Sequence, residues 1–329
     1  MEKRTLGRTG YDVSVVGLGT WQLGADWGNV TEADARAVLE ASIEEGVTFF
    51  DTADVYGDGR SEQVIGRYLE STGHPVTVAT KMGRRMEQRP ENYSLEHFRA
   101  WTDRSRSNLG VETLDLVQLH CPPDPVFHDD RVFDALDTLV DEGAIRHYGV
   151  SVETVDQALA AIARPRVASV QIIVNAFRLK PVEEVLPAAQ EQGVGIIARV
   201  PLASGLLSGR YDASTTFADD DHRNFNRHGE AFDVGETFSG VDFETGVEAA
   251  KEFSALVAEQ APDVAPAQAA IAWLWQQPGV STVIPGARNP QQARSNARAG
   301  GVPPLGAAFD AGVRRLYDTR LRAQIHDHW

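Results

Sequence analysis

The chain contains almost no cysteine and no long apolar run, and both absences exclude classes of protein. Its 329 residues include a single cysteine, Cys121, so an intramolecular disulfide framework and a cysteine-based zinc site are both impossible. No stretch approaches 18 consecutive apolar residues, and the N-terminal residues lack the apolar segment of a secretory signal. We therefore expect a cytoplasmic protein that does not associate with membranes.

Positive charge is also scarce. The chain has 31 Lys and Arg residues against 47 Asp and Glu residues, which gives a formal net charge of −16. Nucleic acids and anionic membranes attract basic proteins, so this balance argues against both as partners.

Several well-known site motifs are missing or incomplete. Gly17 and Gly19 begin a glycine pattern typical of dinucleotide-binding Rossmann folds, but Gln22 stands where the third glycine belongs. There is no phosphate-binding P-loop and no H-E-x-x-H motif. We expect neither a Rossmann fold nor a metal site.

The sequence alternates between short β-branched runs and longer segments with helical periodicity. The predicted strands cover residues 15–20, 47–52, 76–81, 114–120, 147–151, 170–175, 195–201 and 281–286. The predicted helices lie near 31–45, 61–70, 94–109, 131–142, 153–163, 182–192, 245–260, 266–277 and 290–299. Eight alternating units of this kind predict an α/β protein that forms one (β/α)8 TIM barrel, a single domain over residues 1–329.

Three further segments add to this barrel. Residues 4–14 resemble a small hairpin that precedes the first strand, and residues 308–317 form a predicted helix near the other end. Residues 202–244 carry many Asp and Gly residues and little apolar periodicity. Loops this long are usually functional or disordered, and this one follows the seventh strand, so it should emerge at the C-terminal face of the barrel.

Ionisable residues end three neighbouring strands. Asp51, Lys81 and His120 close the second, third and fourth predicted strands, and adjacent strands lie about 5 Å apart. Tyr56 follows Asp51 by five residues and can reach the same volume. Because catalytic groups of TIM barrels gather at the C-terminal strand ends, these four residues are the predicted catalytic site.

The chemistry of this set points to proton transfer at a carbonyl oxygen. A phenol is a weak acid near neutral pH, but a nearby ammonium group stabilises the phenolate and lowers the pKa of the phenol. We expect Asp51 to keep Lys81 charged, Lys81 to make Tyr56 acidic, and His120 to polarise the carbonyl by a hydrogen bond.

Four segments of the chain resemble signatures of the aldo-keto reductases: residues 49–57 (FFDTADVYG), 79–81 (ATK), 116–120 (LVQLH) and 283–288 (VIPGAR). The resemblance runs from about residue 4 to about residue 320. It implies reversible, NADPH-dependent reduction of an aldehyde or ketone to an alcohol, with a small carbonyl or sugar-like substrate. It also implies Tyr56 as proton donor, Asp51 and Lys81 as its tuners, His120 as the residue that orients the carbonyl, and Trp21 as a pocket wall.

The resemblance further implies a set of residues that bind NADP(H). They are Gly19, Thr20, Trp21, Asp51, Ser151, Gln171, Arg199, Pro201, Leu202, Ser204, Gly205, Leu206, Gly286, Arg288, Gln292 and Asn296, with Asn175 as a further candidate. Arg288 precedes a predicted helix N-terminus, which suits a 2′-phosphate and favours NADPH over NADH.

One residue departs from the family pattern. Many members stack an aromatic ring on the nicotinamide from the end of the seventh strand, where this chain has Arg199. A guanidinium can stack on a flat ring, but a cation is an unusual neighbour for a nicotinamide that becomes positive on oxidation. Arg199 is therefore open to three interpretations: a contact to the nicotinamide, to a phosphate or to the substrate.

Other interpretations remain open for several residues. Ser151 is also a candidate helix cap, and Trp21 and Trp27 are also candidates for the core. Arg84 and Arg85 form either an anion site or a solvated basic pair, and the solvated pair is favoured. The basic residues of the long loop either bind an anionic substrate or only solvate the loop, and solvation is slightly favoured; they are His222, Arg223, Arg227 and His228.

Two other functions also fit the sequence. A Schiff-base lyase or aldolase would use Lys81 as its nucleophile, although pairing with Asp51 would keep that amine protonated. A non-catalytic NADPH-binding sensor or channel-associated subunit would bind the cofactor without turning over a substrate. The sequence does not indicate the physiological substrate, the preferred direction of the reaction or the oligomeric state.

Overall fold

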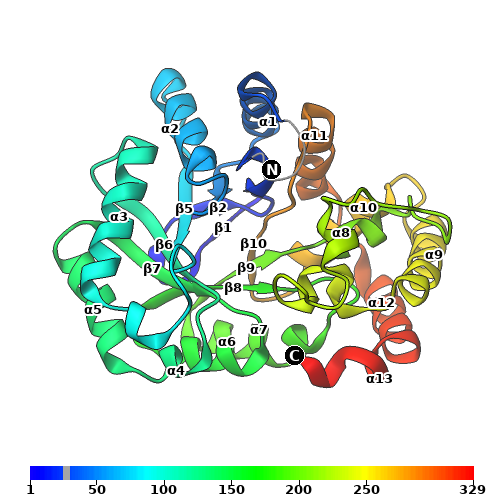
Figure 1. Ribbon diagram of the computed structural model, residues 1–329. Coiled ribbons are helices and arrows are strands. Elements are labelled where there is room, and N and C mark those ends of the chain that lie inside the picture. The colour runs from blue at the N-terminus through cyan, green and yellow to red at the C-terminus, as the bar shows by residue number, and fades with distance from the viewer. Residues whose placement is uncertain (25–29) are drawn as a thin grey trace.

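The structure, a computed structural model, describes residues 1–24 and 30–329. Eight parallel strands follow one another around a barrel in chain order. Their bounds are β3 (Leu18–Gly19), β4 (Phe49–Asp51), β5 (Thr77–Met82), β6 (Leu114–His120), β7 (Ile145–Ser151), β8 (Val167–Ile173), β9 (Gly195–Arg199) and β10 (Val280–Val283). The predicted (β/α)8 barrel is confirmed, and Figure 1 shows the helices arranged around these strands.

The first and last strands close the barrel through isolated bridges rather than a long ladder. Val16 pairs with Val283 and Gly19 pairs with Gly286, both in parallel orientation. The regular part of β3 is therefore much shorter than the predicted strand over 15–20. A Cβ on Gly19 would lie 2.9 Å from the carbonyl oxygen of Ile284, so this close approach requires glycine at position 19.

The helices begin and end near the predicted positions. Their bounds are α1 (Glu32–Glu44), α2 (Arg60–Thr72), α3 (Leu95–Leu109), α4 (Asp124–Phe127), α5 (Asp130–Asp141), α6 (Val155–Ile162), α7 (Lys180–Gln192), α8 (His222–Phe225), α9 (Phe243–Gln260), α10 (Pro266–Trp275), α11 (Pro290–Arg298), α12 (Gly306–Arg320) and α13 (Arg322–Ile325). Thr31 starts α1 with a capping box, because its hydroxyl accepts from the amide of Asp34 and the Asp34 side chain accepts from the amide of Thr31. None of the helices in the described part of the chain has the length and apolar character needed to cross a bilayer.

Two apolar layers fill the structure. The larger layer lies between the strands and the surrounding helices. A smaller one lies inside the barrel and consists of Leu6, Val13, Phe49, Ala79, Leu116, Ile197 and Ile284. Leu6 and Val13 come from the predicted hairpin, whose strands β1 (Lys3–Thr5) and β2 (Asp12–Ser14) pair antiparallel. The hairpin therefore plugs the N-terminal end of the barrel and leaves the opposite end for a site.

The long segment after β9 is ordered by short helical turns. It contains the 3-10 helices η4 (Ala203–Ser208), η5 (Val234–Glu236) and η6 (Phe238–Gly240) as well as α8. Asn226, which is fully buried, accepts from the amides of Ala231 and Phe232 with its side-chain oxygen. Buried polar side chains and a cluster of aromatic rings that includes Phe217 and Phe238 thus fix this segment without apolar periodicity. We name residues 210–242 the strap.

Candidate active site

Strand register brings the predicted catalytic residues to one end of the barrel. Gly19 pairs with Asp51, and Lys81 pairs with Gln118 on the neighbouring strand. His120 pairs with Ser151 at the end of the next strand. The ring centroids of Tyr56 and His120 lie 6.0 Å apart, and the two rings meet edge to face. The structure therefore places all four predicted catalytic side chains around one small volume.

Lys81 and Asp51 form a buried ion pair at the base of this site. The two residues are 1% and 3% exposed, and the ammonium group also donates to the carbonyl oxygen of Thr52 at 3.0 Å. Burial lowers the pKa of Lys81, but the charge interactions and hydrogen bonds with Asp51 and Tyr56 together outweigh burial, and the net pKa is raised. The predicted pairing is present, and Lys81 stays positively charged at neutral pH.

Two glutamine side chains complete the bonding of Asp51. Gln118 donates to the Oδ1 atom of Asp51 at 3.0 Å, and Gln171 donates to the same atom at 2.7 Å. Because Asp51 also accepts from Lys81, its carboxylate is held in one orientation by donors from three strands. The sequence indicated Gln171 as a cofactor contact but not this bond to Asp51.

The phenol of Tyr56 lies above the ion pair, with its oxygen 3.5 Å from the Nζ atom of Lys81. Burial raises the pKa of Tyr56; Lys81 lowers it, while Asp51 and Glu236 raise it again. The net direction is upward, so the expectation of an unusually acidic phenol is wrong for this structure. Tyr56 is a protonated hydroxyl that has a cation beside it.

His120 is a neutral imidazole. Burial holds its pKa well below the usual value, and the cations Arg84, Lys81 and Arg199 lower it further. Its Nδ1 atom has no hydrogen-bond partner among the described residues. A neutral imidazole has one N–H to donate, which suits a hydrogen bond to a carbonyl oxygen.

Arg84 is a second residue for which the structure corrects the sequence-based interpretation. It donates from Nε to the carbonyl oxygen of His120 at 3.2 Å and forms an ion pair with Glu153 at 3.3 Å. Its side chain is only 26% exposed, so the interpretation of Arg84 as solvated is wrong. Arg85 lies apart and pairs with the exposed Asp58.

Ser151 and Gln171 stand side by side at the ends of β7 and β8, where their register pairs them directly. Ser151 is not a helix cap, because Thr154 caps α6. The amide nitrogen of Asn175 donates to the carbonyl of Val200 at 2.9 Å and to Ser239 at 2.8 Å. Asn175 therefore ties the end of β9 to the strap.

The chain after β9 turns sharply through left-handed backbone. Val200, Ala203, Ser204 and Gly205 have φ angles of 54°, 46°, 55° and 101°. Strained conformations of this kind occur at ligand clamps. Within the predicted phosphate loop, Leu206 is part of the core, whereas Ser204 donates to the carbonyl of Glu236 at 2.8 Å.

The region after β10 offers one exposed cation beside a helix start. The Arg288 side chain is 45% exposed, and α11 begins two residues later with Asn289 as its cap. Gln292 accepts from the amide of Arg288, and Asn296 donates to the carbonyl of Gly286, so both fix the backbone here.

The strap forms a wall of the site. Trp21 stacks beside Tyr56 with ring centroids 6.1 Å apart, and on its other side it meets His222 at 5.8 Å and Phe232 at 6.0 Å. Trp21 is therefore placed as the predicted pocket wall, whereas Trp27 lies outside the described residues. His222 and Arg223 are only 12% and 18% exposed, so the slight preference for a purely solvating role is wrong for these two.

Arg199 extends across the mouth from the end of β9. It forms an ion pair with Glu236 of the strap, and its Nη2 atom donates to the carbonyl of Val152 at 3.0 Å. Both side chains are largely buried, at 9% and 16% exposure. No sequence signal identified Glu236, because it comes from an irregular segment 37 residues downstream of Arg199.

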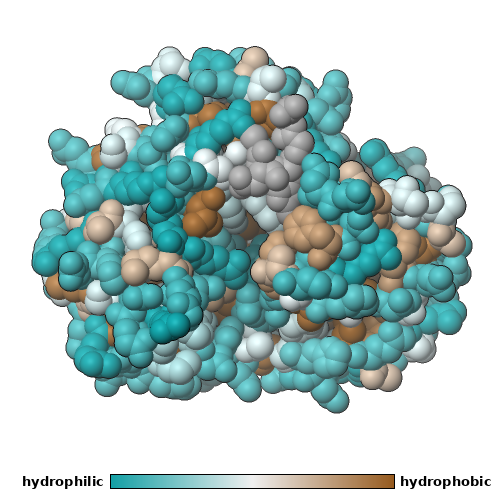
Figure 2. Space-filling model, viewed as in Figure 1, coloured by the Kyte–Doolittle hydropathy of each residue, from teal (hydrophilic) through white to brown (hydrophobic). Residues whose placement is uncertain are grey.

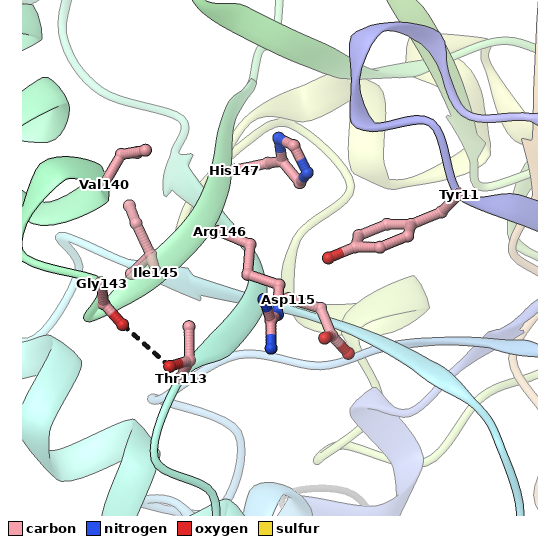
Figure 3. A pocket seen from close by; sticks show the side chains of 8 residues that line it. All are labelled: Tyr11, Thr113, Asp115, Val140, Gly143, Ile145, Arg146 and His147. Carbon is pink, nitrogen blue, oxygen red and sulfur yellow. Dashed lines mark hydrogen bonds between the residues drawn. The ribbon is translucent and has the colours of Figure 1, made fainter.

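A hollow of about 550 Å³ lies at the start of β6 and β7 and is lined by other residues than those above (Figure 3). Asp115, Arg146 and His147 line it, and the rings of Tyr11 and His147 meet edge to face there. It belongs to the N-terminal end of the barrel, where residues usually serve stability. The face of the molecule in Figure 2 is mostly hydrophilic and shows no broad apolar area.

Comparison with known proteins agrees with the geometry. Residues 15–316 match the model of the aldo/keto reductase family. The chain is 29% identical to the uncharacterized oxidoreductase YqkF of Bacillus subtilis, over 98% of this chain and 95% of that one. It is 28% identical to the aldo-keto reductase yakc [NADP(+)] of Schizosaccharomyces pombe, over 86% and 83% of the two chains.

Among solved structures, the glycerol dehydrogenase AKR11B4 from Gluconobacter oxydans is similar, with a TM-score of 0.79 and 28% identity over 94% of this chain and 93% of that one. A barrel of eight parallel strands, the cluster at its C-terminal end and the match over most of the chain agree with one another. This chain belongs to the aldo/keto reductase family and is an oxidoreductase.

Proposed function

We propose that the protein reduces an aldehyde or ketone to an alcohol with NADPH and that Tyr56 supplies the proton. The observation that carries this proposal is the buried Lys81–Asp51 pair with the Tyr56 oxygen 3.5 Å from the ammonium nitrogen. Such a cation is placed to stabilise the phenolate that forms once the proton has left.

The residues present fit a nicotinamide dinucleotide. Ser151 and Gln171 offer a hydroxyl and an amide at adjacent strand ends, and Arg288 offers an exposed guanidinium next to a helix N-terminus, which suits a phosphate. The relative from Schizosaccharomyces pombe carries NADP(+) in its name. NADPH held by these residues would supply a hydride for the carbonyl carbon.

The chain itself handles the carbonyl oxygen. His120 is neutral and donates a hydrogen bond that polarises the oxygen, and Tyr56 then gives its proton to the same atom. The Lys81 ammonium group then stabilises the negative charge left on the Tyr56 oxygen. Asp51, which is fixed by Gln118 and Gln171, keeps Lys81 in place. Because Lys81 is paired and its pKa is raised, it is a poor amine nucleophile, which disfavours a Schiff-base mechanism.

The test is NADPH oxidation against a panel of aldehydes, ketones and keto sugars, with Tyr56→Phe as the matched variant. We expect wild-type turnover, and in Tyr56→Phe a loss of at least about 100-fold in kcat with nearly unchanged NADPH affinity. Full activity of Tyr56→Phe would overturn the mechanism. NADPH binding without reduction of any panel member would favour a sensor or subunit, and a Lys81 adduct trapped by borohydride would favour an aldolase.

A further inference from the structure

Two guanidinium groups flank the residue that would orient the substrate carbonyl. Arg84 donates to the backbone carbonyl of His120, and the Nη2 atom of Arg199 lies 3.9 Å from the sulfur of Cys121, the next residue. Both cations also lower the pKa of His120, so both act on it electrostatically. Two positive side chains therefore lie beside the predicted reaction centre.

Arg199 is not fully satisfied by its partners. Its Nη1 atom serves Glu236 and its Nη2 atom serves Val152 and Cys121, but its Nε atom has no partner among the described residues although the residue is 7% exposed. A buried guanidinium with a spare donor is costly unless something accepts from it. The unpaired Nε donor of Arg199 indicates that a bound ligand supplies a further acceptor here.

Glu236 indicates which kind of acceptor binds to the Arg199 guanidinium. Its carboxylate pairs with Arg199 and is close enough to Tyr56 to raise the pKa of the phenol. A carboxylate is therefore already bound to this guanidinium, and it acts electrostatically on the predicted proton donor. It arrives on the strap, whose contacts to the barrel here include the hydrogen bond from Ser204 to the Glu236 carbonyl and the Asn175–Ser239 bond. Neither of those bonds involves the Glu236 carboxylate, so its side chain can turn away without breaking them.

We propose that Arg199, together with Arg84, is an anion subsite for the carboxylate of an oxo-acid substrate, and that Glu236 is an internal carboxylate which this substrate displaces. The proposal rests on the proposed reductase function and names its substrate class. Arginine binds a carboxylate through two parallel hydrogen bonds, which fixes the direction of the ligand as well as its position. The aromatic wall of Trp21 and Phe232 would cover the apolar part of the substrate.

The first test compares two aldehydes of equal length, 4-oxobutanoate and its methyl ester. Wild type should prefer the acid by about tenfold or more in kcat/KM, since a charge-assisted hydrogen bond contributes a factor of this order. Arg199→Met should bring the acid-to-ester ratio close to one, and Glu236→Gln should raise it several-fold because the internal competitor is weakened. Glu252→Gln, at an exposed pair with Arg320 on the helical shell, is the control and should leave the ratio unchanged.

The outcomes separate the subsite from a purely structural latch between strap and barrel. Equal loss for acid and ester in Arg199→Met, or no rise of the ratio in Glu236→Gln, would overturn the subsite. If Arg199→Met does not fold, Glu236→Gln decides alone, because it leaves no buried carboxylate unpaired.

A binding measurement that needs no turnover separates this proposal from the reductase itself. Calorimetry of the NADPH-loaded protein should show binding of succinate but not of succinamide, and tighter binding of succinate to Glu236→Gln. If the wild type reduces both aldehydes with equal efficiency, the subsite fails and the reductase function stands. If it reduces no carbonyl yet binds succinate in this pattern, the reductase function fails and the anion site stands.

Discussion

The Nζ atom of Lys81 lies 3.5 Å from the phenol oxygen of Tyr56, while the same ammonium group is paired with Asp51. One buried cation thus serves a permanent anion and a group that becomes an anion only during reaction. Substitutions at this site should therefore change the stability of the protein and its activity independently, and both can be measured.

The ion pair itself gives the first prediction. Lys81→Met leaves the Asp51 carboxylate buried without its cation and should lower the free energy of unfolding by about 3–5 kcal/mol. The double variant Asp51→Asn/Lys81→Met should recover much of this loss, because the uncompensated charge is gone. Activity should stay at least about 100-fold down in both. Urea unfolding and NADPH oxidation check this, and activity that recovers together with stability would contradict it.

The pKa directions predict a flat pH profile for reduction. The pKa of Tyr56 is raised above its ordinary value of 10 and the pKa of His120 is well below its ordinary 6.5, so neither group changes protonation between about pH 6.5 and pH 9. We expect kcat/KM to be constant over this interval and to fall above about pH 10, where the phenol loses its proton. A tenfold fall with a midpoint near pH 8 would show that Tyr56 is as acidic as the sequence suggested.

Asp54 gives a prediction on stability. It is fully buried, and neither carboxylate oxygen has a partner among the described residues. Burial and then the Glu62 carboxylate raise its pKa to about 7 against the lowering by Arg85 and Arg104. The unfolded chain releases this proton near pH 4 and the folded chain near pH 7, so Asp54 lowers stability progressively as the pH rises from 4 to 7 and by a constant amount above that.

The variant Asp54→Asn should remove this pH dependence. We expect wild type to lose about 3 kcal/mol relative to Asp54→Asn between pH 4.5 and pH 8, which is most of the effect of a pKa change of about three units. Urea unfolding of both proteins at the two pH values measures the difference. An equal response of wild type and variant to pH would show that Asp54 ionises freely in the folded state.

Arg288 tests the predicted preference for NADPH. The side chain is 45% exposed and stands next to the start of α11, where a 2′-phosphate gains from the guanidinium and from the helix N-terminus. Arg288→Ala should raise KM for NADPH about tenfold or more and leave KM for NADH nearly unchanged. Arg294→Ala removes a cation of the same helix that pairs with Glu44 and should alter neither value. Equal losses with both cofactors in Arg288→Ala would exclude a phosphate-specific role.

The barrel and the place of Asp51, Lys81 and His120 could be predicted from residue order alone. Alternation of short strands and helices is a local pattern, and residues that end neighbouring parallel strands must meet at one end of a barrel. The place of Trp21 as a pocket wall followed from the resemblance to the aldo-keto reductases.

Three features became apparent only in the folded chain: the raised pKa of Tyr56, the Gln171–Asp51 bond and the Arg199–Glu236 pair. The pKa of a phenol depends on how much burial opposes the neighbouring cation, and burial cannot be read from residue spacing. Glu236 reaches Arg199 from an irregular segment held by scattered polar and aromatic contacts, and such contacts leave no periodic trace in a sequence.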